Sequence, residues 1–123
     1  MGVEGQDHED DLDYLVHKII NLRIFSDASD KMNLDVRNIG GSILLVSQFT
    51  LCASTRKGNR PSFHTAAEPG KGEQMYKDAI EKFKSHDLIV ETGEFGANMQ
   101  VSLVNEGPVT IFLDSSDRFQ PRR

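Results

Sequence analysis

Residues 40–51 read Gly-Gly-Ser-Ile-Leu-Leu-Val-Ser-Gln-Phe-Thr-Leu, and this stretch decides the fold class. Ile43 to Val46 form an uninterrupted apolar run rich in strand-forming residues, which is typical of a strand buried on both faces of a sheet. We therefore predict a central strand over Ser42–Leu51. The run has four residues and is the longest in the chain, whereas a membrane-spanning helix needs about 20. No membrane segment or membrane partner is expected.

Two amphipathic helices are predicted on either side of this strand in the chain. The first follows a cluster of carboxylates at Asp7–Asp11, and its apolar residues recur at helical spacing: Leu12, Leu15, Val16, Ile19, Ile20 and Leu22. The second follows Pro69, and its apolar residues have the same spacing: Met75, Tyr76, Ala79, Ile80 and Phe83. Each apolar stripe is expected to pack on the sheet.

The rest of the chain predicts further strands, joined by turns. Alternating or continuous apolar residues indicate strands at Leu88–Thr92, Met99–Asn105 and Val109–Asp114. Ser26–Asn38 is polar and broken, which indicates a loop with at most a short extended piece, and Ser115–Arg123 should be a frayed tail. We predict an α/β (α+β) fold: a single domain over residues 1–123, with a mixed or antiparallel sheet and two main helices packed on it.

Charge is distributed unevenly along the chain. The net charge is -5, and six acidic residues but no Lys or Arg occur in the first thirteen positions. The remainder carries 14 basic and 13 acidic residues, so the body of the protein is nearly neutral. Three basic residues gather in the loop Ser54–Pro61, namely Arg56, Lys57 and Arg60. From spacing alone, this loop fits either a local phosphate contact or a solvated loop kept soluble by its charges.

Most familiar catalytic signatures are absent from the sequence. It contains no G-x-S-x-G, no P-loop, no dinucleotide fingerprint and no H-E-x-x-H. The four histidines are scattered without an i,i+4 pair, so no metal or other cofactor is expected. Cys52 is the only cysteine, which fits a reducing compartment, and the N-terminus has no secretory signal. A cytoplasmic location is expected.

Two polar segments lie at the ends of predicted strands, where the chain is expected to leave the core. The first is Ser47-Gln48-Phe49-Thr50-Leu51 and the second is Asn105-Glu106-Gly107-Pro108-Val109-Thr110. Their hydroxyl and amide groups donate and accept hydrogen bonds without charge, which suits recognition of a neutral polar ligand better than acid–base chemistry.

The combination of S-Q-F-T-L with N-x-G-P-V-T resembles the D-aminoacyl-tRNA deacylase family, in its main D-specific branch. Four more blocks resemble that family, in family order: Asn21–Phe25, Gly58–Phe63, Thr92–Ala97 and Met99–Val104. The resemblance implies a homodimer with a β-barrel-like assembly. It also implies hydrolysis of D-aminoacyl-tRNA, and of glycyl-tRNA mischarged on tRNA-Ala, to free tRNA and amino acid.

The resemblance implies catalytic roles for Ser47, Gln48, Phe49 and Thr50, which would polarise the ester carbonyl. If Thr50 were a nucleophile, it would need an activating base that the motif does not supply, so we expect a non-covalent role for it. The resemblance also makes plausible that the vicinal hydroxyl of the terminal ribose of the tRNA assists the hydrolysis. Near these residues, Phe63 and Met99 would contact the terminal adenine of the tRNA. The phosphates of the acceptor end would be contacted by Arg56, Lys57 and Arg60. For Phe63 and Met99, a plain core role is the alternative.

Substrate chirality would be read by Gly107 and Pro108, with Thr110 beside them. In the family this Gly-Pro pair is a cis peptide that reaches into the partner's pocket. A glycine backbone approaches a ligand closely and a proline has a fixed φ, so the pair would form a rigid main-chain wall. Such a wall admits hydrogen on one face of the substrate α-carbon and rejects the side chain of an L-aminoacyl group.

Family members begin with additional strands, so the resemblance makes this chain N-terminally truncated. An uncovered sheet edge would then threaten the dimer. The alternative function is therefore an inactive RNA-binding or dimer-interfering fragment of the same family. A third hypothesis is an unrelated esterase that uses Thr50 as its nucleophile.

Overall fold

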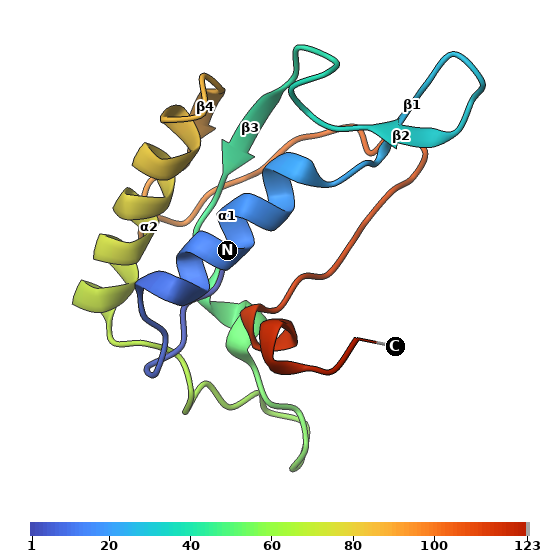
Figure 1. Ribbon diagram of the computed structural model, residues 1–123. Coiled ribbons are helices and arrows are strands. Elements are labelled where there is room, and N and C mark those ends of the chain that lie inside the picture. The colour runs from blue at the N-terminus through green and yellow to red at the C-terminus, as the bar shows by residue number, and fades with distance from the viewer. Residues whose placement is uncertain (123) are drawn as a thin grey trace.

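The computed structural model describes residues 1–122 and contains two long helices beside two small sheets (Figure 1). The elements in chain order are α1 Glu9–Asn21, β1 Phe25–Ser26, β2 Met32–Leu34, β3 Ser42–Leu45, the 3₁₀ helix η1 Phe49–Cys52, α2 Pro69–Lys84, β4 Ile89–Thr92 and the 3₁₀ helix η2 Ser115–Phe119. The α/β class and the two main helices are confirmed.

Local sequence accounts for both long helices. At the start of α1, the Asp11 side chain accepts a hydrogen bond from the backbone N–H of His8, and the first turn is acidic. At the start of α2, Glu68 caps the helix by accepting from the backbone N–H of Lys71, and Pro69 occupies the first turn. Both predicted helices are thus confirmed.

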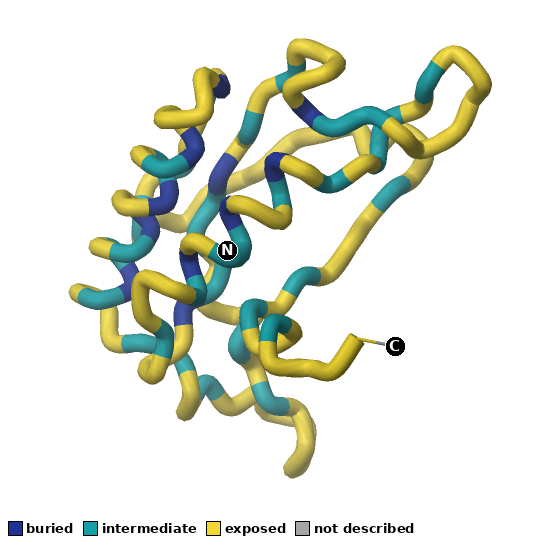
Figure 2. Tube along the Cα trace, viewed as in Figure 1, coloured by how far each residue is buried: buried dark blue, intermediate teal, exposed yellow. Residues whose placement is uncertain are grey.

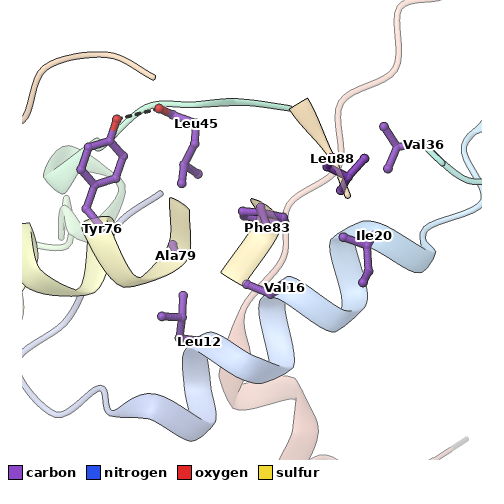
Figure 3. Packing of buried hydrophobic residues seen from close by; sticks show 9 residues of the cluster. All are labelled: Leu12, Val16, Ile20, Val36, Leu45, Tyr76, Ala79, Phe83 and Leu88. Atoms are coloured by element: carbon purple, nitrogen blue, oxygen red, sulfur yellow. Dashed lines mark hydrogen bonds between the residues drawn. The ribbon is translucent and has the colours of Figure 1, made fainter. Parts of the chain in front are cut away.

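The core lies where α1, α2 and the β3–β4 pair meet (Figure 3). From α1, Leu12, Val16 and Ile20 are buried at intervals of four, which places them on one face of the helix. They join buried residues of α2, β3 and neighbouring segments: Val36, Leu45, Tyr76, Ala79, Phe83 and Leu88. This packing fixes α2 against both strands.

The central strand is shorter and more exposed than predicted. β3 ends at Leu45, and the chain then turns into η1 instead of continuing to Leu51. Among residues 1–122, only β4 pairs with it, in a parallel register that runs from Ser42 opposite Ile89 to Leu45 opposite Thr92. The prediction that this strand is buried on both faces is wrong, because the Leu44 side chain points away from the core and is 57% exposed.

β1 and β2 form a separate antiparallel pair, within and beside the predicted loop Ser26–Asn38. The turn between them is held by Asp27, whose carboxylate accepts from the backbone N–H groups of Ser29 and Lys31.

No helix in residues 1–122 is long and apolar enough to cross a membrane.

The two predicted C-terminal strands are wrong for the single chain. Within the described residues, Met99–Asn105 and Val109–Asp114 carry no strand pairing and run as an extended segment over the surface. Figure 2 shows this segment as almost entirely exposed, and its large apolar side chains include Leu103 at 70% exposure and Val104 at 91%. An alternating pattern predicts a strand only where a neighbouring strand can complete the ladder.

Part of the segment predicted as a frayed tail forms η2 instead. Asp114 caps this 3₁₀ helix by accepting from the backbone N–H of Ser116. Arg118 then donates to the Asp11 carboxylate on α1, which holds η2 against that helix.

Candidate functional site

The carboxyl ends of β3 and β4 bring two of the predicted site segments to the same edge. Because the strands are parallel neighbours, the residues that follow Leu45 and Thr92 leave the sheet side by side. The backbone N–H of Gly93 donates to the Leu45 carbonyl at 3.3 Å, which ties the two exits together. Ser47–Thr50 follows one strand and Gly93–Met99 follows the other.

Gln48 and Thr50 form a polar pair at the start of η1. Gln48 Nε2 donates to Thr50 Oγ1 at 2.5 Å, and both side chains are exposed. The backbone N–H of Gln48 donates to the Met1 carbonyl at 2.7 Å, which anchors this segment to the N-terminal residues. An amide donor cannot take a proton from a hydroxyl, so this contact orients Thr50 without activating it as a nucleophile.

Phe49 and Phe63 meet edge to face beside this pair. Their ring centroids are 5.0 Å apart with an interplanar angle of 65°. Phe49 is 56% exposed while Phe63 is half-buried, so together they present an apolar surface that solvent reaches. The structure therefore places Phe63 beside the segment Ser47–Leu51 rather than in the buried core.

Met99 lies against the exit of β4. Its sulfur accepts from the backbone N–H of Glu94 at 3.4 Å. Gly93 makes this position available, since a Cβ there would lie 2.8 Å from the Met99 sulfur. Met99 is outside the buried core and is 36% exposed, which is compatible with a contact surface.

The basic loop projects from the same end of the molecule, directly after η1. Two backbone hydrogen bonds between Ser54 and Ser62, at 2.7 and 2.9 Å, close its base. Arg56, Lys57 and Arg60 are all exposed on it. The loop therefore presents three cations to solvent, a few residues after the polar pair in the chain.

A surface hollow of about 440 Å³ lies between η1 and this loop, and its lining includes Cys52, Arg56, His64 and Thr65. The pKa of the Cys52 thiol is raised by burial, so the thiol stays protonated and suits a packing role. His64 and Thr65 were not predicted as site residues. Their position next to Phe63 in the sequence is the signal that could have found them.

A larger hollow of about 600 Å³ lies between the start of α1 and α2. None of the predicted site residues lines it. Lys82, one of its cations, already pairs with Glu9 and Asp13 at 3.1 and 2.7 Å. Among the described residues, no three metal-binding side chains come together. We therefore place the candidate site at the β3–β4 edge.

The Gly107–Pro108 turn is built as a closed unit. The peptide between these residues is cis, and Gly107 has φ +131°. Asn105 spans the turn: its Oδ1 accepts from the backbone N–H of Val109 at 3.2 Å, and its Nδ2 donates to Thr110 Oγ1 at 3.0 Å. Side chain and backbone thus hold the turn in one shape.

One chain does not bring this turn to Gln48. In Figure 1 the orange segment that carries it bends at the end of the view where β1 and β2 are drawn, whereas the green η1 lies toward the opposite end. The predicted site residues therefore form two groups in the single chain. Ser47–Thr50, Phe63, Met99 and the basic loop form one, and Gly107, Pro108 and Thr110 form the other.

Comparison with known proteins gives a consistent result. A family model described as D-Tyr-tRNA(Tyr) deacylase matches residues 1–114. A protein of Finegoldia magna named D-aminoacyl-tRNA deacylase is 54% identical over 115 residues, covering 94% of this chain and 78% of that protein. A protein of Thermosipho africanus with the same name is 52% identical over 119 residues, covering 97% of this chain and 80% of that protein.

Two solved structures share the fold. One, described as c-Myc DNA Unwinding Element Binding Protein, superposes with a TM-score of 0.83 at 40% identity, over 90% of this chain and 76% of that chain. Another, described as a probable eukaryotic D-amino acid tRNA deacylase, has a TM-score of 0.61 at 16% identity, over 80% of this chain and 72% of that chain. At that identity, the second likeness bears on the fold alone.

Proposed function

Because this chain belongs to the D-Tyr-tRNA(Tyr) deacylase family, we propose that it hydrolyses the ester bond of D-aminoacyl-tRNA. Water adds to the ester carbonyl carbon, the bond from that carbon to the ribose oxygen breaks, and a proton passes to the ribose oxygen. Free tRNA and a D-amino acid are released. The observation that carries this proposal is the identity above 50% to two proteins named for that activity, over nearly the whole chain.

In the proposed mechanism, Gln48 and Thr50 orient and polarise the ester. Each is exposed, uncharged and fixed by their mutual hydrogen bond, so the pair can meet a carbonyl without first losing an ion's hydration shell. Ser47 and Phe49 complete this segment. Thr50 acts without a covalent intermediate, and the vicinal hydroxyl of the terminal ribose assists the attacking water.

The end of the tRNA binds beside this pair. The apolar surface of Phe49 and Phe63, with Met99 across the strand exits, receives the terminal adenine. Arg56, Lys57 and Arg60 contact the phosphates of the acceptor end, which makes binding local and dependent on salt. A small cationic contact reconciles an RNA substrate with a net charge of -5.

Discrimination between D- and L-aminoacyl groups is supplied by Gly107 and Pro108 of a second copy of the chain. Gly107 presents bare backbone, and the Asn105 bridge holds the turn in shape. Main-chain atoms placed against the substrate α-carbon accept hydrogen and reject a side chain, so L-aminoacyl groups are excluded while D-aminoacyl and glycyl groups pass. Thr110 supports this wall through its bond to Asn105.

Two observations support a homodimer. The single chain separates the turn from Gln48, so a complete site needs the turn of another copy. In addition, the 99–113 segment exposes large apolar side chains that lack a strand partner within the described residues: Val101, Leu103, Val104, Ile111 and Phe112. Pairing with a second copy would cover this surface. We place the enzyme in the cytoplasm, where its substrate is made and used.

The experiment that tests the proposal compares D-tyrosyl-tRNA with L-tyrosyl-tRNA. At catalytic enzyme concentration, the chain should release D-tyrosine and leave the L-ester at the background rate. Equal rates for both esters, or no loss of the D-ester, would refute it. A chain that binds the acceptor end without turnover, and that suppresses an active homologue on mixing, would instead support the interfering fragment.

A further inference from the structure

Tyr76 has a buried hydroxyl that the proposed mechanism does not use. The residue is 4% exposed, and its hydroxyl donates to the Leu45 carbonyl at 2.7 Å (Figure 3). The same hydroxyl lies 3.3 Å from the Gly93 carbonyl. A buried hydroxyl needs such a partner, but a phenylalanine would fill the same space without one.

The two carbonyls lie at the points where the site segments leave the sheet. Leu45 is the last residue of β3, two positions before Ser47, and Gly93 directly follows β4. The Leu45 carbonyl also accepts from the backbone N–H of Gly93. One phenol of α2 therefore ties both strand exits to the helix that the core holds in place.

The contact continues from Tyr76 toward Met99. The Tyr76 ring packs on Phe95, with centroids 6.1 Å apart, and the Phe95 ring lies 3.4 Å from where a Gly72 side chain would begin. Phe95 lies in the segment between Gly93 and Met99, so α2 holds the middle of this segment as well as its start. The Met99 sulfur then occupies the space left free by Gly93.

We propose that Tyr76 is a positioning residue. It sets the distance between the Gln48–Thr50 pair and Met99 in the deacylation site. Its hydroxyl holds the exit that leads to Gln48 and Thr50 at a fixed distance from the exit that leads to Met99. A substrate bridging the adenine surface and the polar pair depends on that spacing, because small displacements of oriented groups cost large factors in rate. This inference rests on the proposed function.

Tyr76→Phe is the decisive variant. It keeps the ring against Phe95, and the Leu45 carbonyl keeps its bond from Gly93, so the chain should remain folded. We expect kcat for D-tyrosyl-tRNA to fall roughly 10-fold and KM to change less than about threefold, since tRNA phosphate contacts lie elsewhere. Tyr14→Phe is the matched control, because it removes the other phenol of the sequence, which belongs to a half-buried residue of α1 outside the core cluster.

Gly93→Ala perturbs the contact between the β4 exit and Met99 directly, without changing Tyr76. Its new methyl would lie 2.8 Å from the flexible Met99 sulfur, so Met99 should move while Tyr76 is untouched. Gly5→Ala is the control, because a methyl there meets its nearest neighbour at an ordinary 3.9 Å. With ¹³C-methyl methionine, both Tyr76→Phe and Gly93→Ala should shift the Met99 signal and leave that of Met32, in β2, unchanged.

The methyl spectra do not depend on enzymatic activity. A Met99 signal that moves in both test variants and in neither control, together with the fall in kcat, supports the positioning role. A Tyr76→Phe protein with the kcat and the Met99 signal of Tyr14→Phe overturns it. If the native chain releases no D-amino acid, the proposed function fails, and the Met99 signal alone then decides whether Tyr76 sets the spacing.

Discussion

Gly107→Ala probes the proposed chirality wall at its most sensitive backbone position. Gly107 has φ +131°, a conformation that residues with a side chain rarely adopt. The added Cβ would also lie 3.0 Å from the backbone nitrogen and from Cγ2 of Val109. Both effects act on the turn itself, because Gly107 is exposed and packs on no part of the core.

Backbone strain of this kind costs about 1–3 kcal/mol. At about 1.4 kcal/mol per factor of ten, the native turn should become about 5 to 140 times less populated relative to relaxed alternatives. The rate of D-tyrosyl-tRNA hydrolysis should fall by a similar factor. Discrimination against L-tyrosyl-tRNA should weaken too, because a relaxed turn no longer blocks the α-carbon.

The assay measures kcat/KM for both tyrosyl esters alongside thermal unfolding. Gly40→Ala is the control, since Gly40 also has a positive φ, of +64°, but lies between β2 and β3 with open space around it. This control should keep native selectivity. A Gly107→Ala enzyme with native rate and native selectivity would refute the role of this turn.

Three further predictions follow from the site and its surroundings. Thr50→Ala should lower kcat by about 10-fold, as expected for an orienting hydroxyl, whereas loss of at least about 10⁴-fold would identify a nucleophile. Lys57→Ala should raise KM and reduce the slope of log binding constant against log salt by about one, while Lys84→Ala on α2 should change neither; equal slopes for both would rule out the phosphate contact. The hydrogen bond from Arg118 holds the pKa of Asp11 well below its usual 3.8, so stability from this pair is complete above that value and is lost as the pH falls through and below it. Thermal unfolding of Asp11→Asn should show a lower midpoint at neutral pH and a smaller loss between pH 5 and pH 3, and a native-like pH profile would contradict this assignment.

The helices could be predicted because their signals are local. Apolar spacing in the segments that contain Val16 and Tyr76 already indicates one buried face, and acidic or capping residues mark each helix start. The strand exits were also predictable in part, since S-Q-F-T-L follows an apolar run. Parallel pairing of β3 and β4 then brings Gln48 and Met99 to one edge.

The C-terminal strands could not be decided from the sequence in this way. Residues 99–113 alternate as a strand does, but a strand needs a neighbour, and its absence from the described chain cannot be read from the pattern. The same holds for Ser42–Leu45, whose apolar run indicates two covered faces while the single chain covers one. The contact of Arg118 with Asp11 joins residues too far apart in sequence to be predicted from spacing.

The central claim is that each site takes Gln48 from one chain and Gly107 from another. Mixing Gln48→Ala with Gly107→Ala protein tests this directly, after unfolding and refolding the two together. About half the dimers should then be mixed, and each mixed dimer should contain one intact site, so D-tyrosyl-tRNA hydrolysis should recover to about one quarter of the native rate. A mixture no more active than the two variants measured apart would contradict a site shared between chains.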